Sequence, residues 1–308
     1  MTEALGIIQG VLSSPCVGIC RLDDATGWCL GCARDANELG CWRDLSPAAQ
    51  ALIWADLPRR KAILGLSFRL LPWSGAVLLA EFIRLAREPK TGWSIGVYGA
   101  VAEFASSNHA TPTIEVGEGR LVLRTPGGAM RLHPPAGTRM FELVGATGKV
   151  ERRVLALHRS RLSGIPAVGV TELGADEDAI EPTRKADRLF DLGVSRHVVH
   201  FCVRTGEPAL VAALRGANGL DPLDPANGLV PALLASSPDR VLISPIGRIE
   251  VYAPILRLGR EGPHTHLLPN LLALGHELEP GFALPEGYAA GVSIFPLASQ
   301  EACTLSSK

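Results

Sequence analysis

Apolar residues recur at helical spacing in the stretch before Pro89. Between residues 73 and 88 they fall on one broad face of a helix, and Pro89 predicts where that helix ends. The following stretch, residues 93–104, consists mostly of small and apolar residues, which is typical of a buried strand. The hydrophobic pattern therefore predicts a helix followed by a strand in this part of the chain.

Short runs of β-forming residues, separated by turn residues, predict a meander of strands next. Its segments are residues 113–116, 120–125 and 129–133, with glycine- or proline-containing turns between them. Further strands are predicted over residues 139–144, 150–158, 167–173, 195–205, 241–244 and 248–252, and helices over residues 182–191, 208–215 and 229–235. Because clustered strands precede interleaved helices without regular alternation, we expect an α+β domain with a mainly antiparallel sheet.

The N-terminal segment differs from the rest of the chain, because it holds five of the seven cysteines. Two short helices are predicted here, over residues 35–42 and 47–56, and Ser46 suits the cap of the second. A core of this size needs bound metal for much of its folding free energy. We therefore expect two units, a four-cysteine metal-binding module over residues 13–60 and an α+β domain over residues 66–300.

Four cysteines of this module have the spacing of metal ligands. Cys16 and Cys20 form one pair, and Cys29 and Cys32 form a second pair after eight intervening residues. Each pair can chelate one ion from a tight turn, and two pairs close a tetrahedral shell of four sulfurs. A zinc ion and an iron–sulfur cluster both accept four thiolates, so the spacing leaves both cofactors open. Buried apolar cysteines or a disulfide are the simpler alternative.

The residues around these cysteines resemble a known family. The resemblance rests on Ser14-Pro15-Cys16-Val17-Gly18-Ile19-Cys20 and Thr26-Gly27-Trp28-Cys29-Leu30-Gly31-Cys32-Ala33-Arg34, followed by Glu38, Trp42 and Leu57-Pro58-Arg59. These segments are similar to the short bacterial domain of unknown function 1289, whose members are described as predicted iron–sulfur proteins. The resemblance implies that the four cysteines are the ligands. Cys41 falls at a position that the family pattern does not fix, so it is left out of the shell.

The charge balance of the chain places few constraints on its partners. The sequence has 30 basic and 31 acidic residues, a formal net charge of -1, and 47% hydrophobic against 20% charged residues. This composition is typical of a folded globular protein, and without a global positive field nucleic acid is not an expected partner. The basic run at residues 59–61 is expected to be solvated surface rather than a docking patch. The partners are unknown, and a protein partner is left open.

The sequence predicts a cytoplasmic location. Its start lacks the basic region and cleavage site of a secretory signal, and no apolar run is long enough for a membrane span. In a reducing compartment, closely spaced cysteines act as metal ligands or redox groups more often than as disulfides. The expected location therefore agrees with the metal-binding interpretation.

Reactive residues alternate along the strand that is predicted over residues 195–205. One face carries Arg196, His200, Cys202 and Arg204, whereas the other face is mostly apolar. Such a face predicts either an anion-binding site or a Cys/His nucleophile pair. However, His200 and Cys202 would lie about 7 Å apart along an ideal strand, too far for a direct hydrogen bond. An ordinary half-exposed strand face is the simpler interpretation.

Two other clusters of polar residues need no catalytic role. His264 and His266 lie in a Gly- and Pro-rich segment and predict two imidazole ligands, with His276 or Glu277 as a third, although plain surface is the alternative. The acidic residues 176–178 precede basic residues and suit the start of the next predicted helix. Neither cluster changes the functional prediction.

Several catalytic motifs are absent from the sequence. The chain has no phosphate-binding loop, no dinucleotide-binding glycine pattern, no serine-hydrolase elbow and no His-Glu-x-x-His zinc motif. Nucleotide-dependent transfer and serine hydrolysis are therefore disfavoured. We predict a metal-binding protein with a binding or regulatory role. The alternative is an enzyme with its substrate pocket in the larger domain, in which the metal module gives structural support or relays electrons.

Overall fold

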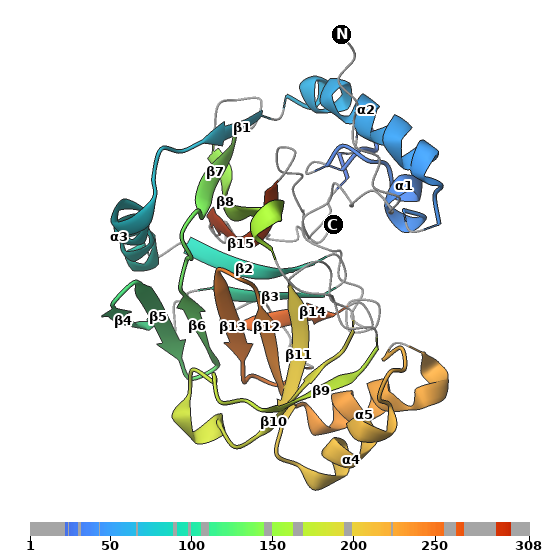
Figure 1. The fold of residues 1–308 in the computed structure, drawn as a ribbon, viewed down its shortest axis with the longest axis vertical. Helices are drawn as coiled ribbons and strands as arrows, with labels where there is room; N and C mark the ends of the chain where they lie inside the picture. Colours follow the sequence, from blue (N-terminus) through green and yellow to red (C-terminus); the bar gives the residue numbers. More distant parts are fainter. Residues whose placement is uncertain are drawn as a thin grey trace, which may run out of the picture.

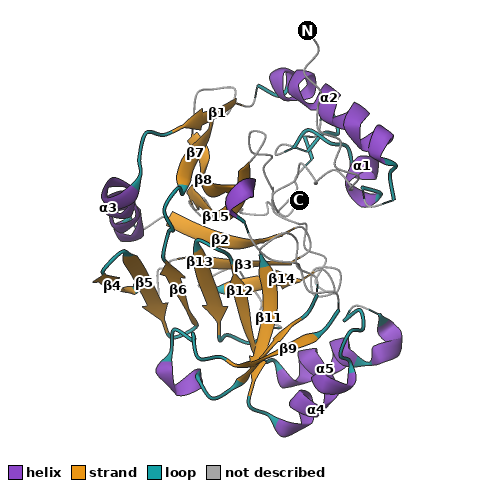
Figure 2. Ribbon diagram, viewed as in Figure 1, coloured by secondary structure: helices purple, strands orange, loops and turns teal. Residues whose placement is uncertain are grey.

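Two antiparallel sheets with a few helices around them make up the described part of the protein (Figures 1 and 2). The structure is a computed structural model of the 308-residue chain. It describes residues 22–23, 25–29, 32–42, 44–65, 67–88, 91–97, 100–105, 111–144, 150–162, 169–193, 199–222, 224–255, 263–267 and 288–296. Within these residues, the predicted α+β class with mainly antiparallel pairing is confirmed.

The larger sheet contains the predicted meander at one edge. In spatial order, its strands among the described residues are β4 (Thr113–Gly117), β5 (Arg120–Thr125), β6 (Gly128–Leu132), β13 (Gly247–Val251), β12 (Asp239–Ile243), β11 (His200–Thr205), β10 (Arg188–Asp191) and β9 (Thr171–Ala175). All neighbouring strands in this eight-stranded sheet are antiparallel. Strands β11 to β13 therefore lie in its interior, where both faces of the sheet can be covered.

The second sheet joins distant parts of the sequence. Its seven described strands are, in spatial order, β1 (Ser67–Leu70), β7 (Arg139–Val144), β8 (Val150–His158), β15 (Tyr288–Pro296), β2 (Thr91–Val97), β3 (Ala100–Ala105) and β14 (His264–Leu267). The strand β15 lies between β8 and β2, and its register shifts between Ala290 and Val292. Gly291 occupies this bulge, where an added Cβ atom would come within 2.7 Å of the Ile246 side chain. The last described strand thus closes the middle of the sheet.

The helices lie at the periphery of the sheets. They are α1 (Ala36–Gly40), α2 (Pro47–Ile63), α3 (Gly75–Arg87), α4 (Pro208–Gly216) and α5 (Leu229–Ser236), with single 3-10 turns η1 (Arg159–Arg161), η2 (Pro182–Arg184) and η3 (Pro225–Asn227). Figure 1 shows α1 and α2 at one end of the molecule and α4 and α5 at the other. None of the described helices is long and apolar enough to cross a membrane.

The main hydrophobic core lies between the two sheets, where β2 and β3 approach β12 and β13. It includes Leu155 of β8, Phe201 of β11 and Ile249 of β13. The helix α3 contributes Phe82, whose ring meets the ring of Trp93 edge-on at a centroid distance of 6.3 Å. The apolar periodicity that predicts α3 therefore marks the face that packs on this core.

Three predicted elements differ from the structure. The single strand predicted over residues 93–104 is instead two antiparallel strands, β2 and β3, in which Trp93 pairs with Phe104, and residues 98–99 lie outside the described part. The helix predicted over residues 182–191 is wrong, because only η2 is helical and β10 follows it. The strand predicted over residues 195–205 is described only from Val199 onward, because residues 195–198 lie outside the described part.

The error at β10 has a physical cause. Phe190 points into the main core and Leu189 packs on the opposite face with Cys202, so the side chains have the period of a strand. Both neighbours, β9 and β11, supply backbone partners for this segment. Non-local pairing thus overrides the local charge pattern that suggests a helix.

The helix α2 is longer than the sequence predicts. It begins after Ser46, whose side chain accepts a hydrogen bond from the Ala49 backbone as expected for a cap. It then continues through Pro58 and beyond residue 60 to Ile63. The basic run at residues 59–61 is therefore the last part of a helix and not the start of a linker.

Candidate functional site

Of the four predicted metal ligands, Cys29 and Cys32 lie in the described part, whereas Cys16 and Cys20 lie outside it. A turn leads into the described pair. The Asp23 carboxylate accepts hydrogen bonds from the backbone and the hydroxyl of Thr26, at 2.8 and 2.7 Å. Gly27 has the left-handed φ of 68° that this turn requires. The polypeptide therefore enters Cys29 from a fixed direction.

Cys29 and Cys32 form a tight turn of their own. The Cys29 backbone N–H donates to Arg34 O at 2.7 Å, and the Ala33 N–H donates to Cys29 O at 2.7 Å. The Cys32 N–H points at the Cys29 Sγ atom, with an N–Sγ distance of 3.5 Å. Ala33 has a φ of 59°, a left-handed conformation that costs a non-glycine residue about 1 kcal/mol or more. Such a conformation persists where surrounding contacts impose it, and the Ala33 N–H that donates to Cys29 O is one of those contacts.

Both cysteines of this turn are fully buried, and a cation reaches one of them. The Arg34 guanidinium is 1% exposed, and its Nε donates to Cys32 Sγ at 3.4 Å. Its Cζ atom lies 4.7 Å from the ring centroid of Trp42. Burial lowers the pKa of Lys61, and the charges of Cys32 and Cys29 act against that shift. Each of the two sulfurs thus accepts one N–H group, and the donor to Cys32 is a cation.

The helices α1 and α2 are tied to this turn through Arg60. Its guanidinium pairs with Glu38 at Nη1–Oε2 2.7 Å and donates to Ala33 O at 3.2 Å. Its Nε pairs with Asp56 at 2.7 Å. Glu38 in turn closes the capping box of α1 with Asp35. The prediction of plain solvated surface at residues 59–61 is therefore wrong for Arg60, whose side chain is only 13% exposed.

Cys41 is engaged elsewhere. Its thiol donates to Asn37 O at 2.8 Å and lies 3.0 Å from the Asn37 side-chain oxygen, both within α1. Among the described residues, which do not include Cys16 and Cys20, no group of three or more His, Cys, Asp or Glu side chains is arranged to hold a metal ion. The metal-ligand assignment therefore stays a prediction for all four cysteines.

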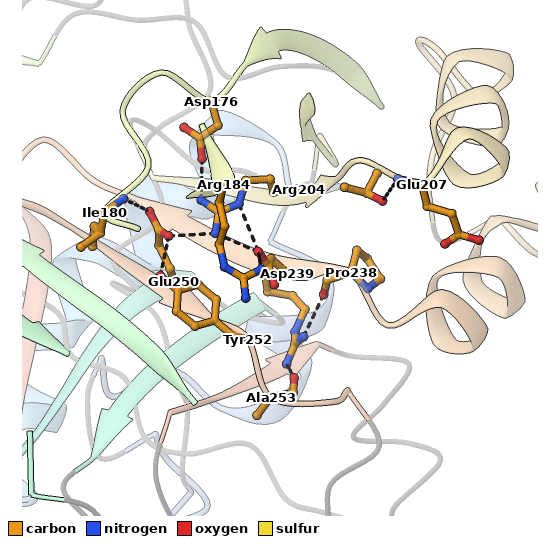
Figure 3. A network of polar contacts seen from close by, with 12 residues as sticks. Asp176, Ile180, Arg184, Arg204, Glu207, Pro238, Asp239, Glu250, Tyr252 and Ala253 are labelled. Atoms are coloured by element: carbon orange, nitrogen blue, oxygen red, sulfur yellow. Dashed lines mark hydrogen bonds and ion pairs between the residues drawn. The ribbon is translucent and has the colours of Figure 1, made fainter. Parts of the chain in front are cut away.

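A second polar cluster, which we call the ion-pair network, lies on the face of the eight-stranded sheet opposite the main core (Figure 3). Its centre is Arg204 on β11, which is 1% exposed. The guanidinium binds Asp176 through Nη1 and Asp239 through Nη2, both at 2.8 Å. Nη2 also lies 2.9 Å from Glu250 Oε2. Arg204 is therefore held by three carboxylates.

A second arginine shares these carboxylates. Arg248 on β13 contacts Asp176 and binds Glu250 at Nε–Oε1 2.6 Å. The Tyr252 hydroxyl donates to Glu250 at 2.9 Å, and the Ile180 backbone N–H donates to the same carboxylate at 2.9 Å. Glu250, which is 0% exposed, thus accepts hydrogen bonds from residues of the sheet and from the loop between β9 and β10.

The third arginine comes from that loop. Arg184 in η2 donates to Asp239 at Nη1–Oδ2 2.5 Å, and its guanidinium stacks on the ring of Tyr252 at 4.1 Å. Asp176 and Ile180 belong to the same β9–β10 loop (Figure 3). The ion-pair network therefore fastens the loop between Ala175 and Arg188 onto the sheet. The expectation that residues 176–178 start a helix is wrong, because Asp176 serves this network.

The described network is balanced in charge. It contains three arginines and three carboxylates, Arg184, Arg204, Arg248, Asp176, Asp239 and Glu250. Burial opposes the ionisation of Glu250, but the charges of Arg248 and Arg204 outweigh it and hold its pKa below the ordinary value. Burial likewise opposes the charge on Arg204, and Glu250 and Asp239 raise its pKa in spite of it. Each of the three arginines is therefore paired with at least one carboxylate of the described chain.

His200 and Cys202 lie on the same face, as the alternation predicts, but they have different surroundings. The Asp191 carboxylate lies 2.7 Å from His200 Nδ1 and accepts the Gly193 N–H at 2.8 Å. The His200 side chain is 31% exposed. Cys202 is fully buried, and burial together with the charge of Asp191 raises the pKa of its thiol. The Cys202 thiol is therefore unreactive, whereas the His200 ring is oriented and accessible.

The remaining predicted residues fall in three places. Arg196, His276 and Glu277 lie outside the described residues. His264 and His266 lie on the strand β14, which pairs with β3, rather than in a loop. The predicted half-exposed face of the strand over residues 195–205 is mostly buried in its described part, because the β9–β10 loop covers it.

Sequence reasoning finds Arg204 but misses its partners. Arg248 and Glu250 lie two residues apart, so a strand prediction places both on one face. The spacing of Arg248 and Glu250 predicts that they share one face of a strand, but the same spacing is also found on ordinary solvated strand faces. Asp176 and Asp239 come from distant parts of the sequence and give no local signal. Arg34 and Glu38 are visible in the sequence only as part of the family pattern.

We expect the stabilisation that depends on Glu250 to be lost in acid. The folded pKa of this carboxyl lies below its ordinary 4.5, so its contribution is complete above that value and falls as the pH drops further. The difference in free energy of unfolding between the wild type and Glu250→Gln should be large near about pH 7 and shrink towards about pH 3. Denaturant titrations at both pH values measure this difference.

Glu177→Gln is the matched control for this prediction, since Glu177 is an exposed carboxylate in the same loop. Its difference from the wild type should be small at every pH. A wild-type minus Glu250→Gln difference that stays constant through the acid range would contradict an ionised Glu250 in the folded protein.

Two parts of the chain match protein families. Residues 14–61 match a protein of unknown function, DUF1289, which confirms the resemblance seen in the cysteine segment. Residues 78–302 match a family of unknown function, DUF6925, and this match covers α3 from Leu78 and almost all strands of both sheets. No curated protein and no solved structure matches the chain. Since the second match spans more than half of its length, the chain belongs to the DUF6925 family.

Proposed function

We propose that this protein binds a zinc ion or an iron–sulfur cluster through Cys16, Cys20, Cys29 and Cys32. The turn at Cys29 and Cys32 carries the proposal, because both sulfurs are buried and accept N–H groups. Hydrogen bonds of this kind stabilise a thiolate and fix its direction. The pairwise spacing of the cysteines and the match of residues 14–61 support the same ligand set.

The residues around the turn fit a negatively charged metal site. The buried Arg34 side chain donates to Cys32 Sγ and brings a positive charge to it. Leu39 packs against the two cysteines and excludes water from them. Zinc would supply structural cross-linking of the module, and an iron–sulfur cluster would also supply electron transfer. In the cytoplasm, where we place the protein, the thiols would stay reduced and available.

We assign the protein a binding or regulatory role rather than a catalytic one. Two of the candidate residues of the larger domain, Arg204 and Cys202, are buried within the fold. Arg204 is saturated by carboxylates, and Cys202 is buried with a raised pKa.

Serine substitutions test the ligand set. Replacing Cys29 or Cys32 by Ser should remove most of the bound metal, because three thiolates leave an open and labile shell. Cys41→Ser is the matched control, since a serine hydroxyl can still donate to Asn37 O. Metal content per chain, measured on protein purified without oxygen, decides the outcome. If Cys41→Ser loses metal as completely as Cys29→Ser, the ligand assignment is wrong.

The Asp191–His200 pair favours a second candidate, an enzyme that uses His200 as a general base. Asp191 orients the ring through Nδ1 and leaves Nε2 directed away from it. A screen with chromogenic ester and phosphoester substrates tests this alternative. Hydrolysis by the wild type that His200→Asn abolishes would support the enzyme, whereas equal rates in both proteins would reject it.

A further inference from the structure

A buried four-thiolate site needs positive charge nearby. Four thiolates around one divalent ion leave an excess of about two negative charges. Removing such charge from water is costly unless cations and hydrogen-bond donors compensate it. Groups that hydrogen-bond to the ligands also fix ligand orientation, and losing one typically costs about 10- to 100-fold in metal affinity.

Arg34 meets these requirements better than any other cation of the described module. Its Nε atom donates directly to Cys32 Sγ at 3.4 Å, and the whole residue is 1% exposed. Its backbone carbonyl accepts the Cys29 N–H at 2.7 Å, so the same residue contacts both described cysteines. A buried arginine next to a neutral thiol would gain little, but next to a thiolate it forms a charge-assisted hydrogen bond.

Trp42 fixes the guanidinium on its other side. The Arg34 Cζ atom lies 4.7 Å from the Trp42 ring centroid, in cation–π geometry. The Trp42 backbone carbonyl accepts a hydrogen bond from Gln50 Nε2 at 2.8 Å. This bond holds the backbone of Trp42 against the helix α2. The α1–α2 segment therefore holds Arg34 in place beside the cysteine turn.

We propose that Arg34 is a positioning residue of the metal site, which balances the charge of the thiolates and aims Cys32 at the metal. This inference rests on the proposed function, because a metal-free protein gives Arg34 no such task. All four proposed ligands remain when Arg34 is replaced, so its loss should weaken metal retention without abolishing it.

The test uses the full-length protein reconstituted with Co²⁺, whose thiolate complexes absorb visible light. Transfer of Co²⁺ to a competing chelator measures affinity and release rate. Arg34→Met keeps most of the length of the side chain but removes the charge and the N–H donor, and it should lower Co²⁺ affinity by about 10- to 100-fold. Arg34→Lys keeps the charge and should lose clearly less.

Arg59→Met is the matched control, because Arg59 lies on α2, is 60% exposed and pairs with Asp56 rather than with sulfur. It should retain Co²⁺ like the wild type. Equal affinity of Arg34→Met and the wild type would overturn the inference, as would equal losses in Arg34→Met and Arg34→Lys. Should Arg34→Met not fold, Arg34→Lys decides: release close to the wild-type rate supports the inference, and complete loss of Co²⁺ rejects it.

The same experiment separates the two proposals. A wild-type protein without thiolate–Co²⁺ absorption would reject the proposed function, and the role of Arg34 with it. A wild-type protein that shows this absorption, together with an Arg34→Met variant that releases Co²⁺ no faster, would reject the role of Arg34 alone.

Discussion

Replacing Arg204 by Met should lower the free energy of unfolding by about 3–5 kcal/mol. Arg204 is buried among Asp176, Asp239 and Glu250, and its removal leaves three carboxylates facing two arginines. An uncompensated buried charge costs far more than the net value of the ion pairs themselves. Urea titration, followed by circular dichroism of the β-sheets, measures the change.

Arg215→Met is the control for this prediction. Arg215 also pairs with a carboxylate, that of Glu172, but its side chain is 54% exposed. Its loss should cost about 0–1 kcal/mol. The double variant Arg204→Met/Asp239→Asn should be less destabilised than the sum of the single variants, because it restores the charge balance. Additive losses would show that the charges of Arg204 and Asp239 are not coupled.

Stripping the metal should unfold the N-terminal module and leave the larger domain intact. The described core of the N-terminal module is small. Its main buried apolar side chains are Cys29, Cys32, Trp42 and Leu57. Without the metal, the thiolates repel one another and this core does not offset the entropy of the chain. Hydrogen exchange after addition of a strong chelator should show amide protection in α1 and α2 falling to the level of an unfolded peptide.

The two sheets provide the internal control for the chelation experiment. The interior strands β12 and β13 should keep their protection, because the main core contains no proposed metal ligand. The boundary of the protected region is expected between residues 59 and 68, where α2 ends and β1 begins to pair with β7. Loss of protection in β12 and β13 as well would mean that the module and the sheets share one folding unit.

The sequence predicts those parts of the fold in which local signals agree with the final contacts. The helix α3 follows directly from its apolar stripe, and the meander of β4, β5 and β6 follows from its turn residues. The strand β10 is missed because its neighbours in the sheet, not its own residues, decide its conformation. The strand β15 is missed because small residues and a glycine bulge interrupt its apolar pattern.

The same distinction applies to the two polar sites. The cysteine pairs are close in sequence, so their spacing alone predicts a shared site. The ion-pair network joins Arg204 to Asp176, Asp239 and Glu250, which are far from it in the sequence, and no spacing rule predicts these contacts. Arg204 is therefore a sound candidate for a special position, but its role in holding the β9–β10 loop is visible only after folding.

Metal analysis with a visible spectrum, on protein purified without oxygen, tests the central claim most directly. The account predicts one four-thiolate site per chain, either colourless with about one zinc or coloured with iron and sulfide. A coloured protein that dithionite bleaches would indicate an iron–sulfur cluster. A protein free of zinc and iron, with Cys16, Cys20, Cys29 and Cys32 joined in disulfides, would contradict it.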